Sequence, residues 1–202
     1  MLPILPTTHV LYLHGFRSSP MSMKAQKMAQ WVKQEHPKVH WWCPQLPPSP
    51  QAAMDLVLQG TAHWPWAQTA VVGSSLGGFY AQCFAAATGC RALLLNPAVE
   101  PARDLAQHVG LQEAWHDANQ SFYFQPEYVE QLASLQAKLQ TTLQPPAPET
   151  FAIVAKGDEV LRWEEMVSHL PHARIKLLPG SDHALSDFDA HRTDILDFLK
   201  LA

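Results

Sequence analysis

The chain has 202 residues, of which 47% are hydrophobic and 16% are charged, and its formal net charge is −4 at neutral pH. This length suits one domain with a sizeable core. A small acidic excess does not favour general electrostatic binding to nucleic acid or to anionic membranes. No segment approaches the ~18 apolar residues of a membrane-spanning helix.

The cysteines, Cys43, Cys83 and Cys90, lie in apolar segments without the spacing of metal ligands. We interpret them as reduced core thiols, which are typical of a cytoplasmic protein. Residues 1–6 lack the basic and long apolar segments of a secretory signal peptide, so we expect none there. No dinucleotide-binding, phosphate-binding or zinc-binding motif is present, and we therefore expect neither a cofactor nor a metal.

Apolar segments alternate with helical patterns along the chain. Short apolar segments predict six strands, at residues 9–13, 39–43, 69–73, 92–95, 151–155 and 174–178. The intervening and final segments predict helices at 22–36, 52–59, 76–87 and 187–200. Continuous apolar strands separated by helices are typical of a mostly parallel sheet that is covered by helices on both faces.

Residues 73–77, with the sequence GSSLG, join the third predicted strand to the helix after it. A serine between glycines on such a turn is the nucleophile elbow of the α/β-hydrolase fold. The turn is so tight that the positions two before and two after the serine need glycine. This requirement selects Ser75, because Ser74 would have a valine and a leucine there. Cys83 is a weaker alternative nucleophile, since it lies about two turns into the helix.

A serine hydroxyl needs a base within hydrogen-bond reach, and the base needs a carboxylate to fix its tautomer. In this fold an acid and then a histidine follow the serine in chain order, and both should lie just after strands. Asp158 follows the fifth predicted strand and is the expected acid, brought round by a turn at Gly157. Glu159 is the rival acid, and a loop aspartate that caps the next helix is the alternative role for Asp158.

His183 follows the sixth predicted strand and precedes the last predicted helix, which is the place expected for the base. Asp182 beside it is expected to order the turn. The developing alkoxide needs two backbone N–H donors. We assign these donors to Leu76, which opens the elbow helix, and to Phe16, which follows the first strand. His14 is expected to shape that loop rather than to take part in catalysis.

Residues 101–149 interrupt the alternation, because no segment within them is interpreted as a strand. A helix is expected to begin near Pro126, since proline suits the first helical turn. Its apolar stripe consists of Tyr128, Leu132, Leu135 and Leu139, at spacings of 4, 3 and 4. We expect a single α/β-hydrolase domain over residues 1–202 in which residues 101–149 form a cap-like insertion over the active site. A helix packed on the flank of the sheet is the alternative.

Seven segments outside this insertion carry a family resemblance. They are 12–16 (YLHGF), 18–20 (SSP), 44–48 (PQLPP), 72–78 (VGSSLGG), 96–99 (NPAV), 157–161 (GDEVL) and 182–184 (DHA). Together they resemble the YqiA/YcfP-type bacterial esterases, which are small α/β-hydrolases. The resemblance implies carboxyl-ester hydrolysis, with short acyl chains or acyl thioesters as substrates. It also implies catalytic roles for Ser75, Asp158 and His183 at their motif positions.

Arg17 and Leu185 depart from the family's pattern, and residues 101–149 match it poorly. These departures affect what the resemblance implies about the substrate, and they do not affect the triad. The insertion contains two basic residues against six acidic ones. We therefore favour a small or neutral ester over polyanionic acyl-CoA.

The sequence favours a serine carboxyl-ester hydrolase that acts through an acyl-enzyme on a small-molecule ester or thioester. One alternative is a non-catalytic protein that keeps the fold and binds a ligand or a partner. Another is a peptidase, C–C hydrolase or acyltransferase that uses the same triad. The sequence indicates no oligomeric state.

Overall fold

The computed structural model describes residues 5–115, 117–142 and 147–202, except for the side chains of residues 117–120. The prediction that no signal peptide is present concerns residues 1–6, most of which lie outside the described residues. The same holds for positions 116 and 143–146 of the predicted insertion.

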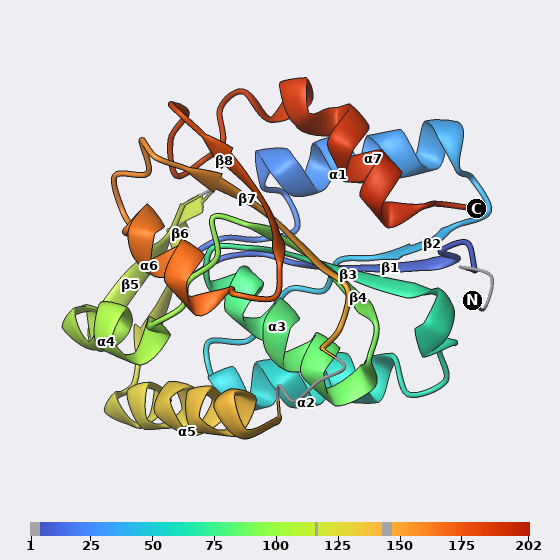
Figure 1. The fold of residues 1–202 in the computed structure, drawn as a ribbon. Coiled ribbons are helices and arrows are strands. Elements are labelled where there is room, and N and C mark those ends of the chain that lie inside the picture. Colours follow the sequence, from blue (N-terminus) through green and yellow to red (C-terminus); the bar gives the residue numbers. More distant parts are fainter. Residues whose placement is uncertain (1–4, 116, 143–146) are drawn as a thin grey trace.

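Six parallel strands form one sheet in the order β2-β1-β3-β4-β7-β8 (Figure 1). They are β1 (His9–Leu13), β2 (His40–Trp42), β3 (Thr69–Ser74), β4 (Arg91–Leu95), β7 (Thr150–Ala155) and β8 (Arg174–Leu178). All six predicted strands are confirmed, and no end differs from its predicted position by more than one residue. The mostly parallel sheet expected from the sequence is therefore confirmed.

Helices cover both faces of this sheet. The helices are α1 (Met23–Glu35), α2 (Pro50–Gly60), α3 (Leu76–Thr88), α4 (Pro101–Leu105), α5 (Pro126–Thr142), α6 (Trp163–His169) and α7 (Arg192–Leu199). Figure 1 shows α1 and α7 over one face of the sheet, and α2, α3 and α5 over the other. Local signals explain two of the helix ends. The Ser49 hydroxyl accepts the Ala52 N–H at the start of α2, and Gly89 ends α3 in a left-handed conformation.

The core is divided by the sheet into two apolar layers. In β1, Val10 and Tyr12 lie in the layer beneath α1 and α7, while Leu11 and Leu13 lie in the layer beneath α2 and α3. These four side chains are fully buried. Successive side chains of a strand point to opposite faces, so a strand covered on both sides is apolar at every position. This arrangement accounts for the continuous apolar segments of the sequence.

The predicted helix at 187–200 is divided in the structure. A 3-10 turn, Phe188–His191, comes first and α7 begins at Arg192. Phe188 is fully buried and stacks on Trp31 of α1, with ring centroids 5.2 Å apart. The Phe188 ring thus packs against α1 at the point where the chain forms a 3-10 turn instead of an α-helix. Helix α6 was not predicted, since it spans only seven residues.

The insertion contains a β-hairpin, and the prediction that it has no strand was wrong. Strands β5 (Gly110–Ala114) and β6 (Asp117–Phe124) pair antiparallel. Leu111 points outward and is 69% exposed, so the usual alternation of apolar-inward and polar-outward residues is missing from β5. The predicted helix is confirmed as α5, which packs against α2 and α3 through Leu132 and Leu139.

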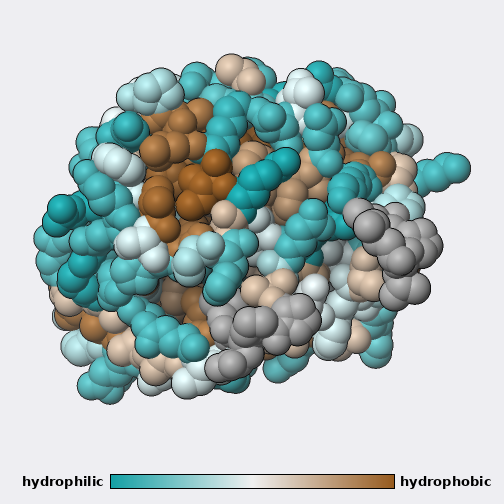
Figure 2. All heavy atoms as spheres, in the orientation of Figure 1, coloured by the Kyte–Doolittle hydropathy of each residue, from teal (hydrophilic) through white to brown (hydrophobic). Residues whose placement is uncertain are grey.

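The face of the molecule drawn in Figure 2 is predominantly hydrophilic. A group of hydrophobic side chains interrupts it over the region that the carboxyl end of β7 occupies in Figure 1. None of the helices among the described residues is long and apolar enough to cross a membrane.

Candidate active site

The structure brings the three predicted side chains, Ser75, Asp158 and His183, together at the carboxyl edge of the sheet. His183 Nδ1 lies 2.8 Å from Asp158 Oδ2, and His183 Nε2 lies 3.0 Å from Ser75 Oγ. An ionised carboxylate can only accept a hydrogen bond, so Nδ1 carries the proton and donates it to Asp158. Nε2 is then left to accept the Ser75 hydroxyl proton, as a general base must.

Ser75 occupies the turn between β3 and α3 with φ 56° and ψ −122°, a strained conformation for a residue with a side chain. A Cβ on Gly73 would lie 2.1 Å from the carbonyl oxygen of Gly77. A Cβ on Gly77 would instead lie 2.0 Å from the carbonyl oxygen of Leu13. Both positions thus require glycine. Gly77 is required by the close approach of the end of β1, rather than by contact with position 73.

Asp158 follows β7 and its side chain is fully buried. Its Oδ1 accepts the N–H groups of Val160 and Leu161 at 2.8 Å and 2.7 Å, while Oδ2 contacts His183. Asp158 therefore orders its own turn and does not cap helix α6, whose N-cap residue is Arg162 and has no side-chain cap hydrogen bond. Gly157 does not have the positive φ that a special turn would need. It permits a close approach instead, since a Cβ there would lie 2.1 Å from the Ser181 carbonyl oxygen.

Glu159, the rival acid, contacts the main chain of the histidine and not its ring. Its Oε2 accepts the His183 N–H at 3.0 Å. Asp182 orders the same turn, because its carboxylate accepts both the N–H and the hydroxyl of Ser186. These contacts separate the roles of neighbouring acids that the sequence alone left open.

Lys24 of α1 also contacts the histidine turn. Its Nζ donates to the carbonyl oxygen of Ala184 at 2.6 Å. Burial lowers the pKa of Lys24 to about 8, against the opposing attraction of Asp182 and Asp158. Sequence reasoning missed this residue, since one lysine in an amphipathic helix is unremarkable.

Asn96 ties the acid strand to the histidine turn. It is fully buried and follows β4 with φ 41°, in the left-handed region that asparagine tolerates. Its Oδ1 accepts the Ala155 N–H at 2.8 Å, and its Nδ2 donates to the carbonyl oxygens of Asp182 and His183 at 2.9 Å and 3.3 Å. This role of Asn96 was not predicted from the sequence. A buried amide directly after an apolar strand was the signal available.

The loop after β1 lies against the elbow. A Cβ on Gly15 would lie 3.1 Å from Ser75 Cβ, so the main chain approaches the nucleophile closely. Among the described residues, we find no acceptor for the N–H groups of Phe16 and Leu76. The Leu76 N–H belongs to the first turn of α3, where no partner exists within the helix. Both predicted oxyanion donors are therefore available beside Ser75.

His14 is buried at the start of this loop and shapes it, as expected. The Leu46 N–H donates to His14 Nε2 at 3.0 Å, so Nδ1 carries the proton and donates to the Gly15 carbonyl oxygen. That carbonyl and the Phe16 N–H belong to one planar peptide group and point in opposite directions. His14 thereby sets the direction of the Phe16 N–H.

Arg17 connects the same loop to the hairpin. Its Nε donates to the Glu113 carbonyl oxygen at 2.6 Å, its own carbonyl accepts the Trp115 N–H at 2.8 Å, and its guanidinium lies 4.3 Å from the Trp115 ring centroid. Phe16 packs edge-on against Phe122 of β6. Arg17, which departs from the family's pattern, thus connects the insertion to the loop after β1. Leu185, the other departure, is fully buried near α1 and α7.

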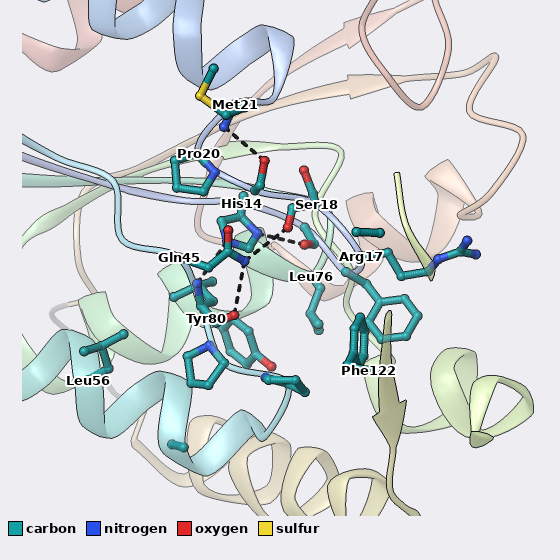
Figure 3. A pocket seen from close by; sticks show the side chains of 18 of the residues that line it. His14, Arg17, Ser18, Pro20, Met21, Gln45, Leu56, Leu76, Tyr80 and Phe122 are labelled. Carbon is teal, nitrogen blue, oxygen red and sulfur yellow. Dashed lines mark hydrogen bonds between the residues drawn. The ribbon is translucent and has the colours of Figure 1, made fainter. Parts of the chain in front are cut away.

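A cavity of about 1330 Å³ opens beside Phe16 and Leu76, the two predicted oxyanion donors (Figure 3). It is walled by residues 14–21 after β1, residues 45–48 after β2, helix α2, two residues of α3 and the β5–β6 hairpin. Most of the wall is apolar. The hairpin is the part of the insertion that borders the cavity, whereas α5 packs on the flank of α2 and α3.

Cys83, the alternative nucleophile, is unsuited to that role because burial raises the pKa of its thiol to about 12. No group of three histidine, cysteine, aspartate or glutamate side chains is arranged to hold a metal ion in the described part of the chain.

Comparisons with known proteins agree with the fold. The model of the uncharacterised protein family UPF0227, the YqiA/YcfP-type family, matches residues 9–200. Est1E from Butyrivibrio proteoclasticus superposes with a TM-score of 0.72 at 14% identity, over 98% of this chain and 90% of that chain.

Alpha/beta hydrolase domain-containing protein 10 from mouse gives a TM-score of 0.70 at 14% identity, over 96% of this chain and 92% of that chain. A structure of the metagenome-derived lipolytic enzymes LipS and LipT gives 0.70 at 16% identity, over 97% of this chain and 95% of that chain. At these identities the likeness is one of fold, and the predicted α/β-hydrolase fold is confirmed.

Proposed function

This chain belongs to the uncharacterised protein family UPF0227, and we propose that it is a serine carboxyl-ester hydrolase that acts through an acyl-enzyme. The observation that carries the proposal is the hydrogen-bonded series Asp158–His183–Ser75 beside the unengaged N–H groups of Phe16 and Leu76. A nucleophile, an oriented base and oxyanion donors are the groups that acyl transfer requires.

In the proposed reaction, Ser75 Oγ attacks the ester carbonyl carbon while His183 Nε2 takes the hydroxyl proton. The negative charge on the carbonyl oxygen is stabilised by the N–H groups of Phe16 and Leu76. The intermediate collapses as the alcohol leaves with the proton from His183, and an acyl-enzyme remains. Water then attacks the acyl carbon as His183 takes its proton, and the carboxylic acid is released when Ser75 regains a proton.

The substrates proposed are small, uncharged acyl esters, with thioesters as the related class. Two carboxylates, those of Glu159 and Asp182, take part in the hydrogen bonds of the His183 turn, against one ammonium group, that of Lys24. The leaving group must lie on this side, so the acidic excess offers little to the several phosphate charges of coenzyme A. A butyryl-CoA thioester should therefore have a lower kcat/KM than a neutral butyrate ester, and the reverse order would contradict the proposed preference.

We also propose that the hairpin serves as the cap within this single domain. Its contacts with Phe16 and Arg17, and its place on the cavity wall, support that role. The α5 segment corresponds to the flanking alternative, since it packs on α2 and α3.

The test is hydrolysis of p-nitrophenyl acetate, butyrate, octanoate and palmitate by the wild type and by Ser75→Ala. We expect activity in the wild type and a loss of at least ~10³-fold in the variant, because the triad acts as a unit. Unchanged activity in a folded Ser75→Ala variant would overturn the proposal. Absence of activity on every ester would favour a non-catalytic binding protein.

A further inference from the structure

The cavity lies on one side of the nucleophile. Phe16 and Leu76 contribute to its wall, but Ser75, Asp158 and His183 do not. In acyl transfer the leaving group must lie beside the histidine that protonates it, and the carbonyl oxygen must lie between the oxyanion donors. The acyl group then extends away from the histidine, so the cavity on the oxyanion side is placed to receive it. This step rests on the proposed function.

One of the polar side chains that line the cavity is Tyr80 of α3. Tyr80 lies four residues after Leu76 and thus on the same face of the helix, one turn further along. Its residue surface is only 3% exposed. Figure 3 shows the ring between Leu56 and Phe122, on the cavity wall.

The Tyr80 hydroxyl has no hydrogen-bond partner among the residues that the structure describes. Burial raises the pKa of this phenol far above its ordinary value, so it stays protonated and can donate. Because Tyr80 lines the cavity, water within the cavity is the partner open to its hydroxyl.

An acyl chain that fills the cavity must displace that water. A plain alkyl chain leaves the hydroxyl without a partner, which is costly for a polar group in an apolar site. A carbonyl, hydroxyl or ether oxygen on the chain would replace the lost hydrogen bond. The neighbouring His14 offers no charge to compete, because Nε2 accepts from Leu46 and Nδ1 donates to Gly15.

We propose that this cavity is the acyl-binding site and that the Tyr80 hydroxyl selects uncharged acyl groups that carry a hydrogen-bond acceptor partway along the chain. One helical turn separates Leu76 from Tyr80, which corresponds to roughly four to six chain carbons beyond the reacting carbonyl. The substrate class is therefore esters of oxo, hydroxy or alkoxy acids rather than of unsubstituted fatty acids.

The experiment compares ethyl heptanoate with ethyl 5-oxoheptanoate and ethyl 6-oxoheptanoate, on the wild type and on Tyr80→Phe. The quantity compared is kcat/KM for an oxo ester divided by kcat/KM for the plain ester. For at least one oxo ester, we expect this ratio to be about fivefold or more lower in Tyr80→Phe than in the wild type. Tyr80→Phe should also raise kcat/KM for the plain ester, since no hydroxyl is then left unpaired. Tyr128→Phe, which removes a phenol hydroxyl on α5 away from the cavity, is the control and should leave every ratio unchanged.

If the ratio of kcat/KM for the oxo ester to that for the plain ester agrees within about twofold between the wild type and Tyr80→Phe, the proposed role of Tyr80 is wrong. An equal loss of kcat/KM on the plain and oxo esters in the variant would also contradict that role. To separate this result from failure of the proposed function, the same esters are titrated calorimetrically into Ser75→Ala and into Ser75→Ala/Tyr80→Phe. Tighter binding of an oxo ester that disappears with the hydroxyl supports the acyl site even without turnover. Equal affinities for plain and oxo esters in the two proteins would contradict it.

Discussion

Two regions meet at the cavity, and they are held in place in different ways. The carboxyl edge of the sheet carries Ser75, Asp158 and His183, and the fully buried Asn96 joins two of its loops by side-chain hydrogen bonds. The β5–β6 hairpin instead leaves Leu111 69% exposed, and it is joined to the loop after β1 through contacts of Phe16 and Arg17.

We infer that the sheet edge is the more rigid of the two regions. Groups that must hold a reacting geometry are fixed by buried polar contacts, each costly to break. The hairpin, which borders the proposed acyl site, buries Phe124 but leaves Leu111, Trp115 and Tyr123 exposed, so we expect it to have the lower local stability. Chemistry should therefore depend on the sheet edge, and substrate access on the hairpin.

The largest expected effect separates the two neighbouring acids. Asp158→Asn should lower kcat about 10⁴-fold, because an amide at this position favours the wrong histidine tautomer. Glu159→Gln should lower it less than tenfold, since Glu159 contacts only the His183 N–H. Ester kinetics on both variants, with circular dichroism to check folding, provide the measurement. Equal losses would mean that the acid has been misassigned.

Asn96→Asp is expected to have the next largest effect. The variant keeps the size of Asn96 and its tolerance of positive φ, but it places an oxygen against the carbonyls of Asp182 and His183. We expect kcat to fall about 10- to 100-fold with KM nearly unchanged, and the protein to lose about 1–3 kcal/mol of stability. A purely structural role would lower the stability but leave kcat of the folded fraction intact, so kcat must be measured well below the melting temperature.

Arg17→Ala tests the other region. The substitution removes the hydrogen bond to Glu113 and the contact with Trp115, so hydrogen exchange over residues 110–115 should become faster. We expect KM for octanoate esters to rise a few-fold with kcat retained, because the hairpin forms cavity wall. A decrease in kcat with KM unchanged would mean that Arg17 supports the geometry of the catalytic residues rather than the cavity wall.

The smallest expected effect is a pH dependence from Lys24. Burial holds the pKa of Lys24 at about 8, so its charge beside the histidine turn is present below that pH and is lost above it. We expect kcat/KM to decline about two- to threefold between roughly pH 7 and 9 as this charge-assisted contact weakens. Lys24→Met should abolish the decline, and Lys24→Arg should move it above this range.

The folding linkage of Lys24 has a definite sign. Between pH 8 and its higher unfolded-state pKa, the unfolded chain binds more protons than the folded one. Stability attributable to Lys24 therefore rises with pH across that range, while activity falls. A melting temperature that falls in parallel with activity would show that the loss of activity comes from unfolding.

Much of the sheet edge was predictable because its signals are local and reinforce one another. Six apolar strands, the GSSLG turn, and acidic and histidine residues directly after strands all indicate one fold. The reasons given for Gly77 and Gly157 were incomplete, since both are required by main chain distant in sequence. Such contacts cannot be read from local patterns.

The hairpin was missed for a different reason. Leu111 points outward and Gln112 inward in β5, so hydrophobic periodicity gave no strand signal. The aromatic segment 122–124, in which Phe124 is buried and Tyr123 is exposed, was the available indication. The roles of Asn96 and Tyr80 likewise depend on which loops and helices enclose them, and tertiary structure alone reveals that.

Labelling with a fluorophosphonate probe, followed by peptide mass mapping, tests whether Ser75 is the nucleophile that His183 activates. We expect a single adduct on Ser75 in the wild type, and labelling slowed at least ~10³-fold in a folded His183→Ala variant. Labelling of a different residue, or labelling of Ser75 at the same rate without His183, would contradict this expectation.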